Sequence, residues 1–157
     1  MKFTRFLMVF VASGVLSGCL TLPKTKDDVR TMQPQMVTVE FNATLPEVMD
    51  SFTTVAKTCG KVWRRTLASM VGWGAAPHFI GIAEYGEDGT SATFEIWSMN
   101  VLSPDYIFEL FEMRSRTDGV VEVIQYQGKA HNNNGDSKGV RPTHIASWYP
   151  PNEVNCW

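Results

Sequence analysis

The order of hydrophobic and polar residues predicts an early strand followed by an amphipathic helix. Residues 37–41 (VTVEF) alternate apolar and polar side chains, which is the period of a half-buried strand. Thr44 precedes Glu47 by three residues, the spacing of a capping box, and Pro46 is tolerated in a first helical turn. We expect the helix to end at Gly60. Its buried face would carry Leu45, Val48, Met49, Phe52, Val55, Ala56 and Cys59.

The chain after this helix has the pattern of strands. Residues 61–71 are predicted to form one strand. Segments 80–85 and 91–99 flank Gly-Glu-Asp-Gly, and segments 106–114 and 120–127 flank Thr-Asp-Gly, so each pair predicts a β-hairpin. We therefore expect an α+β fold, in which an antiparallel meander of five or six strands packs one main helix on a face.

Two segments show no sustained periodicity. Residues 20–36 contain two prolines and mixed charges, and we interpret 19–36 as a flexible tether. Residues 130–139 (AHNNNGDSKG) are polar and glycine-containing, which predicts a loop. The chain then runs through Pro150-Pro151 to Cys156 as an extended tail.

Composition indicates one folded domain, which we place at 37–157. The chain has 157 residues, of which 44% are hydrophobic and 19% charged, and its formal net charge is −2. The densest group of basic residues is Lys61, Arg64 and Arg65, which is too small for an electrostatic nucleic-acid site. We therefore expect no nucleic acid among the partners.

The N-terminus has the order of a signal peptide. Lys2 and Arg5 precede an apolar run over 6–15, which is shorter than the roughly 20 residues that cross a bilayer. The segment Leu16-Ser17-Gly18-Cys19 then resembles the lipobox of bacterial lipoprotein signal peptides. The resemblance covers residues 1–19 alone. It implies that 1–18 are removed and that Cys19 is acylated, so that its acyl chains hold the protein on a membrane.

The residue after the cysteine bears on the destination of the protein. In Gram-negative lipoproteins an Asp at this position commonly retains the protein in the inner membrane, and here the residue is Leu20. By analogy, the resemblance implies the outer membrane, with the domain facing the periplasm. The alternative is an uncleaved helix over residues 6–22, which its serines and glycines disfavour.

Assigning Cys19 to lipid leaves Cys59 and Cys156. In the oxidising compartment that export implies, two thiols favour one disulfide, which would staple the C-terminal tail to the domain. Two free buried thiols or a pair of zinc ligands remain as alternatives. Zinc needs further ligands at a recognisable spacing, and His78, His131 and His144 form none.

No catalytic motif is evident in the sequence. There is no nucleophile elbow, zinc-protease motif or phosphate-binding loop. Strand alternation places Glu95 and Glu109 on faces exposed to water, and His131, Asp136 and His144 flank the polar loop without a fixed ligand geometry. We expect no enzymatic activity, no cofactor and no metal. Glu84, Glu87, Asp88 and Glu112 also lie in predicted strands and turns, but the sequence does not show two of these carboxylates converging for acid–base work.

One tryptophan is a candidate for contact with a partner. Trp73 lies between Gly72 and Gly74, where it would present a large apolar surface on a flexible turn. Alternatively, Trp73 folds back and caps one end of the sheet. The tryptophans expected in or at the edge of the core are Trp63, Trp97 and Trp148.

Together these features predict a lipid-anchored envelope protein that acts as a non-enzymatic binding or assembly module. Its expected partner is an envelope protein, as in an accessory of a secretion, conjugation or envelope complex. One alternative is a carrier of a small apolar ligand or lipid between helix and sheet. Another alternative is an inhibitor of a cell-wall hydrolase.

Overall fold

The computed structural model describes residues 22–32, 36–72, 74–100, 103–127, 145–151 and 156. The main elements, in chain order, are α1 (Lys26–Met32), β1 (Met36–Asn42), α2 (Leu45–Val71), β2 (His78–Tyr85), β3 (Ser91–Asn100), β4 (Ser103–Ser115) and β5 (Val120–Gln127).

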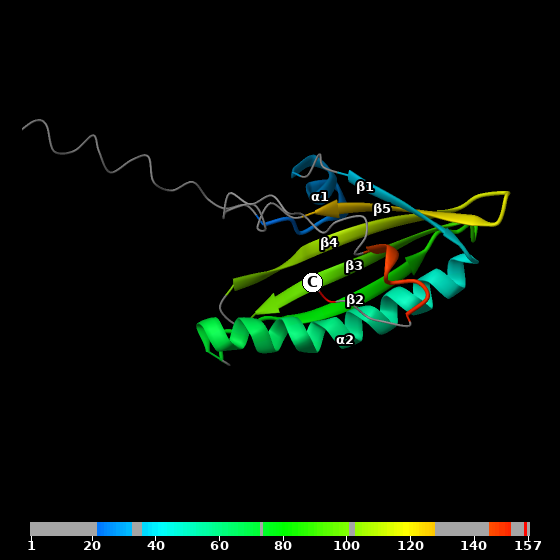
Figure 1. Ribbon diagram of the computed structural model, residues 1–157. Coiled ribbons are helices and arrows are strands. Elements are labelled where there is room, and N and C mark those ends of the chain that lie inside the picture. Colours follow the sequence, from blue (N-terminus) through cyan, green and yellow to red (C-terminus); the bar gives the residue numbers. More distant parts are fainter. Residues whose placement is uncertain are drawn as a thin grey trace, which may run out of the picture.

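The five strands form one antiparallel sheet in the order β1-β5-β4-β3-β2. Strands β2 to β5 are a meander that includes both predicted hairpins, and β1 returns to pair with β5 at the far edge. The two helices lie on opposite faces of the sheet (Figure 1). The predicted α+β class, with an antiparallel sheet and one main helix on a face, is therefore confirmed.

Helix α2 is longer than the sequence analysis expects. It continues through Gly60 to Val71, so the predicted helix end at Gly60 and the predicted strand over 61–71 are both wrong. Lys, Arg, Leu, Ala and Met favour helix in this segment, and Trp63 extends the buried stripe four residues beyond Cys59. The helix ends at Gly72, whose φ of 87° suits a residue without a Cβ.

Two glycines allow α2 to pack closely against β2. A Cβ at Gly60 would lie 3.2 Å from the carbonyl oxygen of Phe79. A Cβ at Gly81 would lie 3.1 Å from Cβ of Ala56 and 2.5 Å from Cζ of Phe94. Gly60 is therefore a point of helix–strand contact and not a helix terminus.

Aromatic side chains fill the core between α2 and the sheet. The ring of Phe52 meets the rings of Phe94, Phe111 and Trp148 edge-on, at centroid separations of 5.9, 5.2 and 5.0 Å. The expected burial of Trp63 and Trp148 is confirmed. Trp97 is half-buried and belongs to the opposite face of the sheet.

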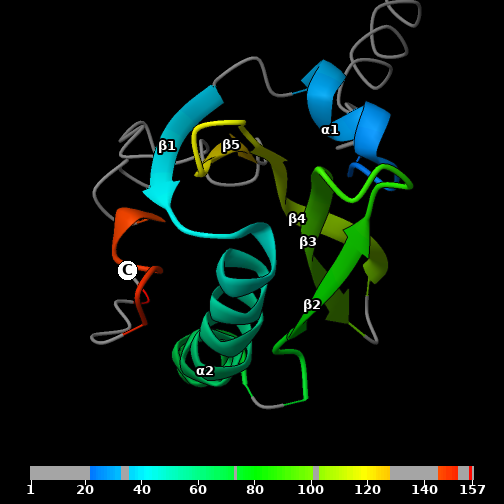
Figure 2. The same ribbon diagram turned by 90° about the vertical axis from the view of Figure 1, so that its right-hand side faces the viewer.

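The predicted disulfide between Cys59 and Cys156 is present, with the two Cα atoms 5.2 Å apart. It joins the middle of α2 to the C-terminal segment, which lies beside α2 and β1 (Figure 2). Nε1 of Trp63 donates a hydrogen bond to the carbonyl of Cys156 (2.7 Å), and Ser51 donates to the carbonyl of Trp148. Free thiols and zinc ligands are thereby excluded for this pair.

Part of the predicted tether is a docked helix. Val29 of α1 is fully buried against Ile107, Leu110 and Tyr126, on the face of the sheet opposite α2. The backbone N–H of Ile107 also donates to the carbonyl of Pro23 (2.8 Å). The expectation of a flexible segment over 19–36 is therefore corrected for residues 22–32. With one buried valine in seven residues, the sequence of this helix shows no recognisable helical period of hydrophobic residues.

Candidate functional site

Strand β2 forms one edge of the sheet. It pairs with β3 on one side, and among the described strands none pairs with its other side. Seven of its eight residues are exposed. Natural edge strands commonly carry Lys or Pro, which discourage pairing with another chain. The sequence of β2, HFIGIAEY, contains neither, although Glu84 is charged and Gly60 of α2 packs against the carbonyl of Phe79. Among the described strands, none covers the free edge of β2.

Apolar side chains surround this open edge. We call the sheet face that carries α1 the outer face. Ile80 and Ile82 project from β2 on the outer face and are 42% and 44% exposed. Trp97 and Met99 of β3 lie beside them, and Met99 is 37% exposed. The β2 edge surface therefore consists of Ile80, Ile82, Trp97, Met99 and the free backbone edge of β2. A contiguous exposed apolar area of this kind is typical of an interaction site.

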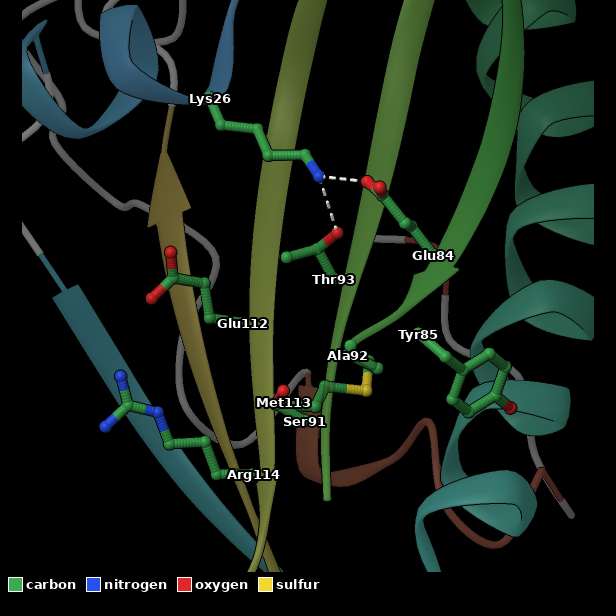
Figure 3. Close-up of a pocket in the computed structure, with 10 residues that line it drawn as sticks. Lys26, Glu84, Tyr85, Ser91, Ala92, Thr93, Glu112, Met113 and Arg114 are labelled. Carbon is green, nitrogen blue, oxygen red and sulfur yellow. Dashed lines mark hydrogen bonds and ion pairs between the residues drawn. The ribbon is translucent and has the colours of Figure 1, made fainter. Parts of the chain in front are cut away.

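Helix α1 bounds the β2 edge surface with a network of ion pairs. Lys26 Nζ pairs with Glu84 and donates a hydrogen bond to Oγ1 of Thr93 (3.0 Å), as Figure 3 shows. It also lies 3.4 Å from Oε1 of Glu95. Burial lowers the pKa of Lys26, but the hydrogen bonds and charges of Glu84 and Glu95 outweigh it, so the pKa lies above its usual value. Lys26 therefore remains charged and holds α1 on the sheet.

The same region contains a pocket of about 310 Å³. Lys26, Thr93, Glu112 and Arg114 contribute to its lining, as Figure 3 shows. Arg30 Nε donates a hydrogen bond to Glu112 (2.7 Å), so Lys26 and Glu112 already have partners of opposite charge within the protein. An ionic ligand here would have to compete with these pairs, which makes the pocket a weaker candidate site than the β2 edge surface.

Two carboxylates occupy positions that differ from the prediction. Glu95 is 8% exposed because α1 covers it, and it accepts a hydrogen bond from Nε1 of Trp97 (2.7 Å). Glu109 is 3% exposed and faces the α2 side. Trp97 pairs with Ile107 and Ile96 with Glu109, so Phe108 is an extra residue in β4. This bulge puts Glu109 out of step with Ile107 and in step with Phe111 and Met113, which are buried on the α2 side.

The buried Glu109 carboxyl is mostly protonated, and therefore neutral, at pH 7. Burial raises its pKa to about 8, and the neighbouring Gln125 amide opposes only part of this rise. Among the described residues its Oε2 atom has no hydrogen-bond partner. Because its carboxyl is buried, we regard Glu109 as a determinant of stability.

The other predicted site residues are only partly described. Gly72 ends α2, and Gly74 lies exposed in the turn that follows. Trp73 lies outside the described residues, as do Cys19 and the suggested loop group His131, Asp136 and His144. Within the described ranges, no three His, Cys, Asp or Glu side chains gather closely enough to hold a metal ion. Nor does a helix there combine the length and apolar character needed to cross a membrane.

The sequence analysis missed the β2 edge surface. Alternation identified the strand, but a period of two cannot distinguish an edge strand from a central one. The available signal was the composition of HFIGIAEY, which has no Lys or Pro and carries two isoleucines on one face. Searches of protein-family models, curated proteins and solved structures find no match to this chain.

Proposed function

We propose that this protein is a lipid-anchored component of the bacterial cell envelope, facing the periplasm, that binds another protein chain through the β2 edge surface. The observation that carries the binding role is the edge of β2, which no other described strand pairs with, beside exposed Ile80 and Ile82. The lipobox-like segment ending at Cys19 supports the anchor. The proposed role is non-enzymatic, and inhibition of a cell-wall hydrolase is one form that such binding could take.

The position of the first described residues supports a short link between domain and membrane. Pro23 is hydrogen-bonded to the sheet through Ile107, and Leu22 is three residues after Cys19. Three residues of extended chain span at most about 11 Å. An acylated Cys19 would therefore hold the α1 side of the domain within a short distance of the lipid surface.

The alternative of an apolar-ligand carrier has less support. A carrier would need an apolar cavity between helix and sheet, whereas Phe52, Phe94, Phe111 and Trp148 pack against one another there. The pocket near Lys26 opens on the other side of the sheet and is lined largely by polar and charged residues.

Replacing the anchoring cysteine should abolish membrane attachment. We expect Cys19→Ser to release the protein into the soluble fraction or to leave its N-terminus unprocessed, because no thiol is left to be acylated. Membrane fractionation and intact-mass measurement of the native protein check this. The double variant Cys59→Ala/Cys156→Ala is the matched control and should remain attached. Retention of Cys19→Ser on membranes after normal processing would refute the anchor.

A crosslinker on the β2 edge surface should capture a protein in intact cells. We expect a photoreactive amino acid at Ile82 to form an adduct at least about five-fold more abundant than one at Thr38, because the apolar edge is where a strand would dock. Thr38 is exposed on the outer face of the opposite edge strand, β1, and is the control. Mass spectrometry identifies the adduct, and equal yields at both positions would argue against the binding role.

A further inference from the structure

We propose that the chain docked on the β2 edge surface is a second copy of this protein, paired antiparallel through β2 about a two-fold axis at Gly81. The proposal rests on the binding role given above and names the partner. Two five-stranded sheets would thereby join into one continuous sheet.

The backbone of β2 offers the hydrogen bonds that this pairing needs. The N–H of Gly86 donates to the carbonyl of Ser91 (2.9 Å), so Gly86 points its backbone groups toward β3. In an antiparallel pair, successive residues point alternately toward and away from the partner strand. The N–H and C=O groups of Phe79, Gly81, Ala83 and Tyr85 therefore face the free edge, which α2 approaches at the carbonyl of Phe79, next to Gly60. Pairing about Gly81 would place Gly81 opposite Gly81 of the second copy and Phe79 opposite Ala83 of the second copy.

The side chains on the outer face complement one another in this register. Ile80 would lie opposite Ile82 of the second copy, and His78 opposite Glu84, with both pairs repeated by the two-fold axis. These pairs fall at the non-hydrogen-bonded positions, where facing side chains are closest. A shift by two residues in either direction would place Ile80 beside Glu84 or Ile82 beside His78. The register about Gly81 is therefore the one that joins apolar to apolar and polar to polar residues.

The charges flanking β2 also favour an antiparallel copy. The β2–β3 turn carries the exposed acidic residues Glu87 and Asp88 at one end of the strand. At the other end, Gly60 of α2 contacts Phe79, and the following helical turn carries Lys61 and Arg64. Antiparallel pairing brings the acidic end of each copy toward the basic end of the other, which promotes association.

The symmetry is compatible with two anchors in one membrane. A two-fold axis through the paired strands and perpendicular to the sheet leaves both outer faces on the same side. Because α1 lies on the outer face (Figure 1), the α1 helices of both copies would lie on that same side. Attachment to one surface would also raise the effective concentration of the two copies. The carboxylates at Glu84 and Glu87 make an anionic lipid surface a poorer occupant of the same face.

Sedimentation equilibrium of the full chain in detergent tests the proposal. We expect a reversible dimer whose dissociation constant rises at least tenfold in Ile80→Lys, because a lysine would face Ile82 of the other copy. Ile80 is 42% exposed, so the variant should keep its circular dichroism and melting temperature. Thr38→Lys, a matched change on β1, should leave the dimer intact. A monomer at every concentration, or a dimer that Ile80→Lys does not weaken, would overturn the proposal.

Disulfide trapping tests the register. A mixture of the Ile80→Cys and Ile82→Cys variants should form a crosslinked dimer at least about five-fold faster than either variant alone, since like positions lie diagonally apart. Equal rates would overturn the Gly81 axis.

If the photoreactive group at Ile82 captures only a different protein, the self-pairing fails while the binding role stands. If it captures none, the binding role itself fails. If Ile80→Lys alters only binding to phosphatidylglycerol vesicles, the occupant is lipid and the self-pairing is wrong.

Discussion

Loss of the Cys59–Cys156 disulfide is expected to lower the free energy of unfolding by about 3–5 kcal/mol. The two cysteines are 97 residues apart, so the bridge closes most of the domain sequence into one loop. This loop lowers the conformational entropy of the unfolded chain. The native state should lose contacts as well. Without the bridge, the hydrogen bond from Trp63 to the Cys156 carbonyl has no covalent support, and the C-terminal segment can fray.

Urea unfolding of the protein with and without reductant measures this effect. The double variant Cys59→Ala/Cys156→Ala provides the control, since its unfolding midpoint should be low and unaffected by reductant. A wild-type midpoint that does not move on full reduction would contradict a stabilising role for the bridge. Membrane attachment should be the same in all these samples, because the anchor depends on Cys19.

Replacing Glu109 with glutamine should stabilise the domain increasingly as the pH rises. The folded-state pKa of Glu109, about 8, lies above the ordinary value of 4.5, so the folded protein holds this proton more tightly than the unfolded chain does. The neutral carboxyl makes its full contribution to the free energy of unfolding below pH 4.5. This contribution is lost as the pH rises to about 8. Above that value the free energy of unfolding of Glu109→Gln should exceed that of the wild type by about 5 kcal/mol.

The measurement is the free energy of unfolding of both proteins between pH 4.5 and 9. The difference between them should be small at the acidic end and should reach a plateau above pH 8. Glu87→Gln is the matched control, because Glu87 is exposed in the β2–β3 turn, and its difference from the wild type should stay nearly constant. A constant difference for Glu109→Gln would show that folding does not raise the pKa of Glu109.

Local sequence patterns predicted much of the secondary structure. The Asp-Gly turns placed the two hairpins, since turn residues restrict the backbone through their own conformational preferences. Thr44 and Glu47 placed the start of α2, where Glu47 accepts a hydrogen bond from the backbone N–H of Thr44 (2.8 Å). These features depend on neighbours a few residues away, so the sequence carries them directly.

The errors arise where distant residues meet. A glycine such as Gly60 is typical of a helix end, but α2 continues through it. Here the missing side chain allows close contact with Phe79, 19 positions along the chain. Val29 gains its burial from Leu110 and Tyr126, which no local period can reveal. For Glu109, alternation counted from Ile107 assigns the outer face, but the bulge at Phe108 puts Glu109 in step with the buried Phe111 and Met113.

By itself, the sequence determined the strand and turn pattern, the start of the main helix, the pairing of its two non-lipobox cysteines and the lipobox-like N-terminus. Tertiary structure alone decided where α2 ends, that α1 docks on the sheet, that Glu109 is buried and that β2 is an edge. The physical reason is the range of the interactions. Turns, caps and alternation act between near neighbours, whereas burial and edge position depend on which strands and helices pack side by side.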